Sequence, residues 1–259
     1  MTIKLISPVD GSVYAERTPL TSEQAQDAAG RAKAAQGLWA ERPVSERMAL
    51  VKAGLVALNG MKDRMVQELA WQMGRPVRYG GEFGGMNERS DYMLSIAEKA
   101  LAPTVVEDSA KMSRRIERAP RGVVLVIAPW NYPYMTAMNT IVPALIAGNA
   151  VMLKHASQTL LVGEMIAEAM RAGGVPVDVF QNVVLDHPGT EALIASRAFG
   201  FVNFTGSVGG GQAIERAAAG TFTGLGLELG GKDPGYVMDD ADLDWAVDVL
   251  MDGAMFNAG

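Results

Sequence analysis

The chain of 259 residues contains no cysteine. Disulfides, thiolate metal ligands and a thiol nucleophile are therefore all excluded for these residues. The only two histidines, His155 and His187, are too few to make a zinc site by themselves. We accordingly expect no bound metal.

Long apolar runs and excess positive charge are also missing. Apolar runs such as 123–128 have the length of a strand and are far too short to span a bilayer. The net charge of -6 favours neither nucleic acid nor an anionic membrane as a partner. The first residues, 1–5, lack the basic and apolar regions of a signal peptide, so a cytoplasmic protein is expected.

Apolar residues are plentiful, at 49% of the chain, and their spacing divides it into two parts. Residues 21–101 have helical spacing and end before Pro103. Thr21-Ser22-Glu23-Gln24 resembles a capping box, with Thr21 or Ser22 as the N-cap, and Ser45 offers a second cap. This part is predicted to be an N-terminal helical region.

Strand and helix patterns alternate in the second part. Thr104–Glu107 and Ser113–Arg118 predict an exposed β-hairpin. Further strands are expected at 123–127, 150–153, 179–185 and 201–204, and helices at 134–146, 159–171, 191–196 and 211–219. Such alternation predicts an α/β fold with a Rossmann-like, doubly wound parallel sheet and a protruding hairpin. We divide the chain into a cofactor-binding domain, 1–230, with its hairpin at 104–118, and the start of a second domain, 231–259.

Three short motifs follow predicted strands, where parallel α/β sheets bind their ligands. They are Pro129–Asn131, Lys154–Ser157 and Thr205–Gly211. The glycine-rich turn of the third motif can approach a phosphate closely, with the N-terminus of the next helix directed at the same anion. It has no G-x-G-x-x-G pattern, so an ordinary strand-to-helix loop remains the alternative. Lys154 can reach a ribose or phosphate, or it can simply be solvated.

Two polar side chains are candidates for catalysis. Asn131, between two aromatic residues, can donate its amide to a developing oxyanion, or it can serve only to make a turn. Glu228 lies in an apolar, glycine-rich stretch where desolvation would raise its pKa and suit it to general-base work. The alternative for Glu228 is an ion pair with a nearby lysine or arginine.

Taken together, these motifs resemble those of the NAD(P)-dependent aldehyde dehydrogenase superfamily. Pro129-Trp130-Asn131 matches its P-W-N, Phe204-Thr205-Gly206-Ser207 with Gly211 its F-T-G-S-x-x-x-G, and Glu228-Leu229-Gly230-Gly231-Lys232 its E-L-G-G-K. The similarity covers most of the chain and is densest from Ala119 to Gly259.

The resemblance implies that a cysteine thiolate attacks an aldehyde, that hydride passes to the nicotinamide, and that water hydrolyses the resulting thioester to a carboxylic acid. Asn131 would hold the oxyanion and Glu228 would activate the water. The hairpin 104–118 would pair subunits in a homodimer or homotetramer of the full-length enzyme. The cofactor-binding residues implied are Ile127, Pro129, Trp130, Asn131, Lys154, Ser157, Gly189, Phe204, Gly206, Ser207, Gly211, Leu229 and Gly230.

The motif Lys154-His155-Ala156-Ser157 departs from the K-P-[SA]-E of many NAD-preferring members, in which the glutamate repels a 2′-phosphate. Ser157 is neutral and stands beside Lys154 and His155. We therefore expect the cofactor to be NADP or NAD, with NADP bound at least as well. The K-H-A-S form is also found in some succinate-semialdehyde dehydrogenases.

The family's cysteine follows a G-Q pair, which places it just beyond Gly259. We therefore interpret the chain as the cofactor-binding portion of an aldehyde dehydrogenase, inactive alone, whose stretch 231–259 exposes apolar surface. One alternative is a truncated, non-catalytic homologue that serves as a nucleotide-binding or subunit-pairing module. Another is an acyl-CoA-forming or phosphate-reducing relative, and Glu228 argues against it because such enzymes need no deacylating base.

Overall fold

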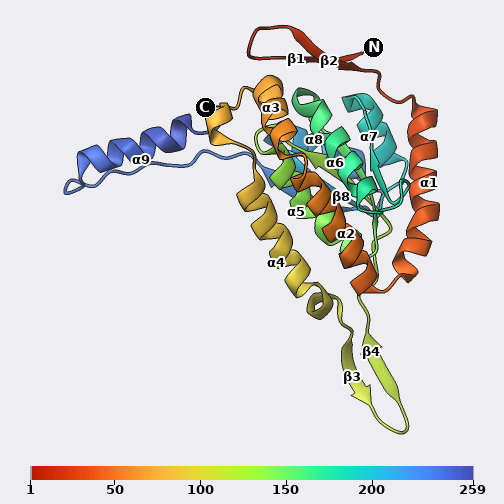
Figure 1. Ribbon diagram of the computed structural model, residues 1–259. Helices are drawn as coiled ribbons and strands as arrows, with labels where there is room; N and C mark the ends of the chain where they lie inside the picture. The colour runs from red at the N-terminus through yellow and green to blue at the C-terminus, as the bar shows by residue number, and fades with distance from the viewer. Residues whose placement is uncertain (1, 259) are drawn as a thin grey trace.

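A five-stranded, all-parallel sheet in the order β7-β6-β5-β8-β9 lies at the centre of the fold (Figure 1). The computed structural model describes residues 2–258; residues 1 and 259, the outer ends of the two predicted domains, lie outside the described residues. The strands are β5 (Val123–Ala128), β6 (Ala150–His155), β7 (Phe180–Asn182), β8 (Phe201–Gly206) and β9 (Gly224–Leu229). The predicted Rossmann-like α/β fold is confirmed.

Strand β5 explains why helices cover both faces of this sheet. All six of its residues are buried, and successive side chains point to opposite faces. Val124 and Val126 join the core under α2 (Val44–Asn59), α4 (Phe83–Leu101), α5 (Pro133–Ile146) and α6 (Leu160–Ala172). Val123 and Leu125 join the core under α1 (Ser22–Glu41), α7 (His187–Ala195) and α8 (Val208–Ala218). The helices that connect the strands are α5 (Pro133–Ile146), α6 (Leu160–Ala172), α7 (His187–Ala195) and α8 (Val208–Ala218), and the 3-10 turn η2 (Ser157–Thr159) precedes α6.

The N-terminal part is helical, as predicted, after a small hairpin. Its elements are β1 (Ile3–Ile6), β2 (Val13–Arg17), α1 (Ser22–Glu41), α2 (Val44–Asn59), α3 (Lys62–Met73), the 3-10 turn η1 (Val77–Tyr79) and α4 (Phe83–Leu101). Thr21 is the N-cap of α1, and its reciprocal hydrogen bonds with Gln24 confirm the capping box. The prediction for Ser45 was wrong. Pro43, whose φ is already helix-compatible, precedes α2, which begins at Val44 without a side-chain cap.

The predicted hairpin is present and extends away from the rest of the fold (Figure 1). Its strands, β3 (Thr104–Asp108) and β4 (Ser113–Ile116), pair antiparallel. Val105, Val106 and Ile116 are more than half exposed on it, at 61%, 57% and 55%. The hairpin therefore presents apolar side chains on a segment that packs little against its own chain.

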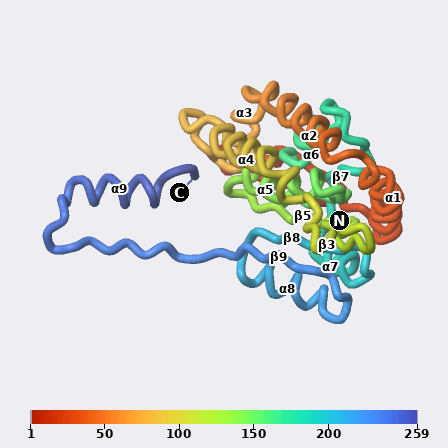
Figure 2. The backbone as a smooth tube through the Cα atoms, turned by 90° about the horizontal axis from the view of Figure 1, so that it is seen from below, coloured from red at the N-terminus to blue at the C-terminus, as the bar shows by residue number. Residues whose placement is uncertain are grey.

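Strand β9 was not predicted, because its glycines obscure a strand pattern. A Cβ atom at Gly224 would come within 2.8 Å of Phe201, and one at Gly226 within 2.8 Å of Asn203. These glycines therefore let β9 pack closely beside β8. Beyond β9 the chain runs outward and returns as α9 (Leu243–Met255), as Figure 2 shows. The side chain of Trp245 on α9 is exposed. Among residues 2–258, no helix combines the length and apolar composition needed to cross a bilayer.

Candidate functional site

Starting from the central strand β5, the chain adds β6 and β7 on one side of that strand. It then adds β8 and β9 on the other side of β5. Ligands bind at such a switch point, beyond the carboxyl ends of the strands. A cleft of about 620 Å³ lies there. Its lining includes Glu228 and every predicted cofactor-binding residue except Gly189 and Gly211, namely Ile127, Pro129, Trp130, Asn131, Lys154, Ser157, Phe204, Gly206, Ser207, Leu229 and Gly230.

Lys154 lies within β6 and not after it, because that strand continues to His155 and pairs with β5 over its full length. Its register partner is Ile127. Burial lowers the pKa of the Lys154 ammonium, and the negative charge of Asp186 opposes that shift. Ser157, at the start of η2, is exposed to the same cleft. A cation and a neutral hydroxyl thus lie on one wall.

His155 does not line the cleft with Lys154 and Ser157. This corrects the expectation that it stands beside Ser157 as part of an anion site. Its ring is buried, with Nε2 3.2 Å from the carbonyl oxygen of Pro133 and Nδ1 accepting from the amide of Ala156 at 3.1 Å. The hydroxyl of Thr159 lies 2.9 Å from Nδ1. Burial lowers the His155 pKa to about 4. The ring is therefore neutral near pH 7 and links β6 to the start of α5.

The glycine-rich segment after β8 is the first turn of α8, since that helix begins at Val208 and not at 211. Ser207 is its N-cap, and its hydroxyl accepts from the amide of Gly210 at 3.1 Å. The first N–H groups of a helix have no partner within it, so those near Val208 can bind an anion. Helices α5, α7 and α8 all begin beside the cleft, which concentrates positive helix ends there.

Gly189 and Gly211 do not line the cleft, for two separate reasons. The amide of Gly189 donates at 2.8 Å to the carboxylate of Asp186, which is the N-cap of α7. Gly211 is buried in α8, where a Cβ atom would lie 2.5 Å from a methyl group of Leu229. Gly211 therefore makes room for the end of β9.

Asn131 stands at the cleft between β5 and α5. Its side-chain oxygen accepts from the amide of Tyr132 at 3.0 Å, which leaves the NH₂ group available to a ligand. Glu228 is register partner to Thr205 on the edge strand β9. Its side chain is exposed, so the burial expected from its apolar sequence surroundings is not provided by residues 2–258. An edge position with no described element beyond β9 explains the difference.

The sequence interpretation overlooked His187, which lines the cleft at the first position of α7. Its place between a strand and a helix is the same signal that drew attention to the three motifs. Within the described part of the chain, no group of three or more histidine, cysteine, aspartate or glutamate side chains could hold a metal ion. Beside the Glu228 carboxylate and the His187 ring, the cleft offers one lysine, hydroxyls, amides and helix N-termini, and these groups suit a phosphate-bearing ligand.

Comparison with known proteins gives a consistent result. The model of the aldehyde dehydrogenase family matches residues 1–259. A 3,6-anhydro-alpha-L-galactose dehydrogenase of Streptomyces coelicolor is 33% identical, over 100% of this chain and 53% of its own length. The succinate-semialdehyde dehydrogenase [NADP(+)] of Mycobacterium leprae is 31% identical, over 100% of this chain and 57% of its own.

A solved structure shows the same arrangement of the backbone. It is the succinic semialdehyde dehydrogenase from Streptococcus pyogenes in complex with NADP+, with a TM-score of 0.89 and 27% identity. The match covers 99% of this chain and 57% of that one. The chain thus spans about half the length of the relatives that it matches.

Proposed function

This chain belongs to the aldehyde dehydrogenase family, and from that premise we propose that its cleft binds the nicotinamide dinucleotide of an aldehyde-oxidising enzyme. The observation that carries the proposal is the position of Lys154 and three helix N-termini around one cleft at the switch point of the sheet. Lys154 and the helix dipoles supply positive charge, and the first amides of α8 supply the free N–H donors that a pyrophosphate needs.

The individual residues fit such a ligand along the cleft. Lys154 and Ser157 would hold the adenosine ribose, and the N-terminus of α8, with Gly206 and Ser207, would hold the pyrophosphate. Leu229 and Gly230 would lie near the nicotinamide, which accepts a hydride when the cofactor is bound. Because Ser157 carries no charge, we further propose that NADP is bound at least as well as NAD.

In the whole protein, the free NH₂ of Asn131 would donate to the oxyanion formed from an aldehyde, and Glu228 would activate water. Attack on the aldehyde would need a thiolate, and this sequence holds no cysteine. We propose that the 259-residue chain binds the nucleotide but does not itself oxidise aldehydes.

We also propose that the hairpin β3–β4 pairs subunits in a homodimer or homotetramer of the full-length protein. Exposed apolar side chains on a protruding hairpin support this role. The acidic net charge of the chain as a whole argues against nucleic acid or an anionic membrane as a partner.

Calorimetric titration of the 259-residue protein with NADP and with NAD tests the proposal. We expect both to bind, with NADP at least as tight. Failure of both to bind would overturn the cofactor assignment, and a strong preference for NAD would overturn only the argument from Ser157. Absorbance of the reduced nucleotide, followed with aldehydes present, should not rise. An increase in this absorbance would show that aldehyde oxidation by this chain does not need a cysteine thiolate, and the proposal of inactivity would be wrong.

A further inference from the structure

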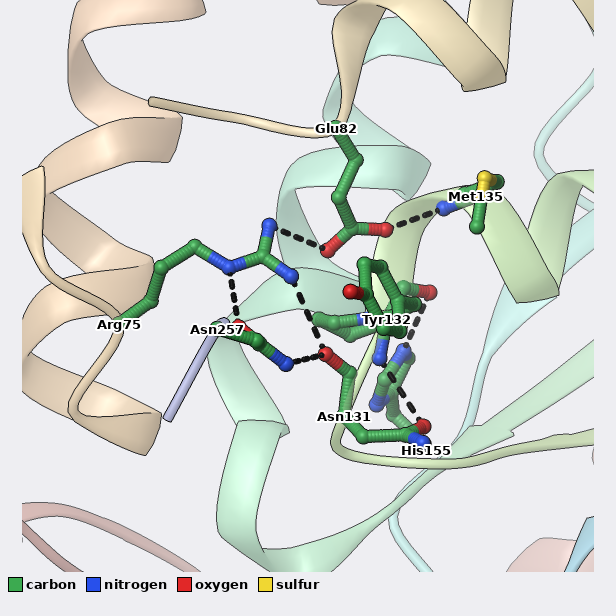
Figure 3. Close-up of polar contacts among 8 residues, drawn as sticks. Arg75, Glu82, Asn131, Tyr132, Met135, His155 and Asn257 are labelled. Atoms are coloured by element: carbon green, nitrogen blue, oxygen red, sulfur yellow. Dashed lines mark hydrogen bonds and ion pairs between the residues drawn. The ribbon is translucent and has the colours of Figure 1, made fainter. Parts of the chain in front are cut away.

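Arg75 lies between α3 and η1 in the chain. Figure 3 shows its side chain among those of Glu82, Tyr132 and Asn257. Its guanidinium is almost completely buried and makes contacts in several directions at once. Nη1 lies 3.3 Å from the Glu82 carboxylate, Nε donates to the side-chain oxygen of Asn257 at 2.6 Å, and Nη2 donates to the backbone carbonyl of Asn131 at 3.2 Å. The group also lies 4.9 Å from the centre of the Tyr132 ring.

The carbonyl oxygen of Asn131 receives a second donor as well. The side-chain NH₂ of Asn257 donates to it at 2.8 Å. Arg75 and Asn257 are therefore hydrogen-bonded to each other, and both donate to the carbonyl oxygen of Asn131. Asn257 follows α9, which means that the returning C-terminal segment completes the arrangement. Its backbone has a φ of 68°, a left-handed conformation that asparagine tolerates better than most residues.

Holding that oxygen has a consequence for the Asn131 side chain. The carbonyl of Asn131 and the N–H of Tyr132 belong to one planar peptide unit and point in opposite directions. When two donors fix the carbonyl, the direction of the N–H is fixed too. That N–H donates to the side-chain oxygen of Asn131 at 3.0 Å, and the NH₂ of the same carboxamide is thereby directed away from the peptide.

We propose that Arg75 and Asn257 are positioning residues that orient the carboxamide of Asn131 by fixing the peptide between Asn131 and Tyr132. The inference deepens the proposed function, because it rests on Asn131 donating to a ligand in the cleft. Arginine suits the position since its rigid fork can serve three acceptors, which a lysine ammonium on a flexible stem does less well. Glu82 balances its charge and also accepts from the amide of Met135 at 2.7 Å, at the start of α5.

The test is made on the 259-residue protein without ligand, by NMR of samples labelled with ¹⁵N at asparagine and tyrosine. We expect Arg75→Met and Asn257→Ala each to speed hydrogen exchange of the Tyr132 amide by roughly tenfold and to loosen the Asn131 carboxamide. Arg75→Lys should restore part of the protection. If Arg75→Met does not fold because Glu82 is left unpaired, the double variant Arg75→Met with Glu82→Gln replaces it.

Arg47 provides a matched control. It is also buried and also donates to backbone carbonyls, but those of Ala40, Arg42 and, at 2.8 Å, Ile146 belong to residues outside the lining of the cleft. Arg47→Met should lower stability while leaving the Tyr132 amide and the Asn131 carboxamide unchanged. Equal effects of Arg47→Met and Arg75→Met, or no change in Arg75→Met and Asn257→Ala, would overturn the proposal.

Titration of the same samples with NADP separates this inference from the function on which it rests. If the unmodified protein binds no NADP while the Arg75 variants free the peptide, the proposed function fails and the positioning contact stands. If NADP binds and the variants leave Asn131 unchanged, the positioning role fails alone.

Discussion

The ion pair of Arg75 with Glu82 is buried, with 4% and 1% of the two side chains exposed and 3.3 Å between Nη1 and Oε1. Glu82 is the N-cap residue of α4 and lies opposite the first turn of α5. Burial raises the pKa of its carboxyl from 4.5 to about 7, although the Met135 amide and the charge on Arg75 lower it. The desolvation of the carboxylate therefore outweighs the groups that stabilise it.

This raised pKa predicts how stability depends on pH. A carboxyl with a higher pKa in the folded state favours folding while it is protonated, and that contribution disappears as the pH rises from 4.5 through about 7. The Glu82→Gln variant has no carboxyl at this position, so its free energy of unfolding should not show this decrease with rising pH. Between pH 4 and pH 8, the free energy of unfolding of the unmodified protein should fall by about 3 kcal/mol relative to that of Glu82→Gln.

Urea unfolding of both proteins across this pH range measures the difference. Glu98→Gln, a change at an exposed side chain, serves as the control and should follow the unmodified protein at every pH. If the free energies of unfolding of the unmodified protein and Glu82→Gln change with pH in parallel, the carboxyl has the same pKa in the folded and unfolded chains. That outcome would contradict the prediction.

A second prediction concerns the contact between α2 and the end of α6. A Cβ atom at Gly173 would lie 2.1 Å from the backbone nitrogen of Gly54, and a backbone cannot move aside as a side-chain tip can. Gly173→Ala should therefore lower the free energy of unfolding by about 3 kcal/mol. Gly30→Ala, in α1 with open space around it, should raise it by up to about 1 kcal/mol through better helix propensity. Equal stability of the two variants would contradict the packing argument.

The alternation of strands and helices, and the motifs at the strand ends, could be predicted because each is a local pattern. The lining of one cleft by Pro129, Lys154 and Thr205 followed from the rule that carboxyl ends of parallel strands meet at one edge, whereas Leu229 was given only by the family resemblance. Strand β9 could not be predicted in this way. Its glycines are explained only by the side chains of Phe201 and Asn203 on the neighbouring strand.

The parts of the site that were missed or misplaced depend on contacts between distant segments. Arg75 and Asn257 stand 182 residues apart in sequence, and neither was among the predicted site residues. His155 looked like part of an anion site because it stands between Lys154 and Ser157, but alternation along β6 turns its ring to the opposite face. A pattern of residue types gives the position along the strand, whereas the surrounding packing decides what each side chain meets.

Lys154 leads to a third prediction, because it combines partial burial with a place in the cleft. Lys154→Met should weaken binding of both NADP and NAD by roughly tenfold, through loss of a charge-assisted hydrogen bond. It should not lower the free energy of unfolding, since burial disfavours the ammonium that is removed. Calorimetric titration and urea unfolding give the two values. Lys33→Met, on the exposed surface of α1, is the control and should change neither.

Ser157 supports the last prediction, which concerns the choice between the two nucleotides. Ser157→Glu would place a carboxylate in the cleft beside Lys154, where it would repel a 2′-phosphate and accept a hydrogen bond from a 2′-hydroxyl. We expect this variant to bind NADP at least roughly tenfold more weakly than the unmodified protein, with NAD affinity kept or improved. Ser157→Ala, which removes the hydroxyl without adding charge, should change the ratio of the two affinities much less. If Ser157→Glu weakens binding of both nucleotides equally, the residue does not lie near the 2′ position, and the argument from Ser157 for NADP binding is wrong.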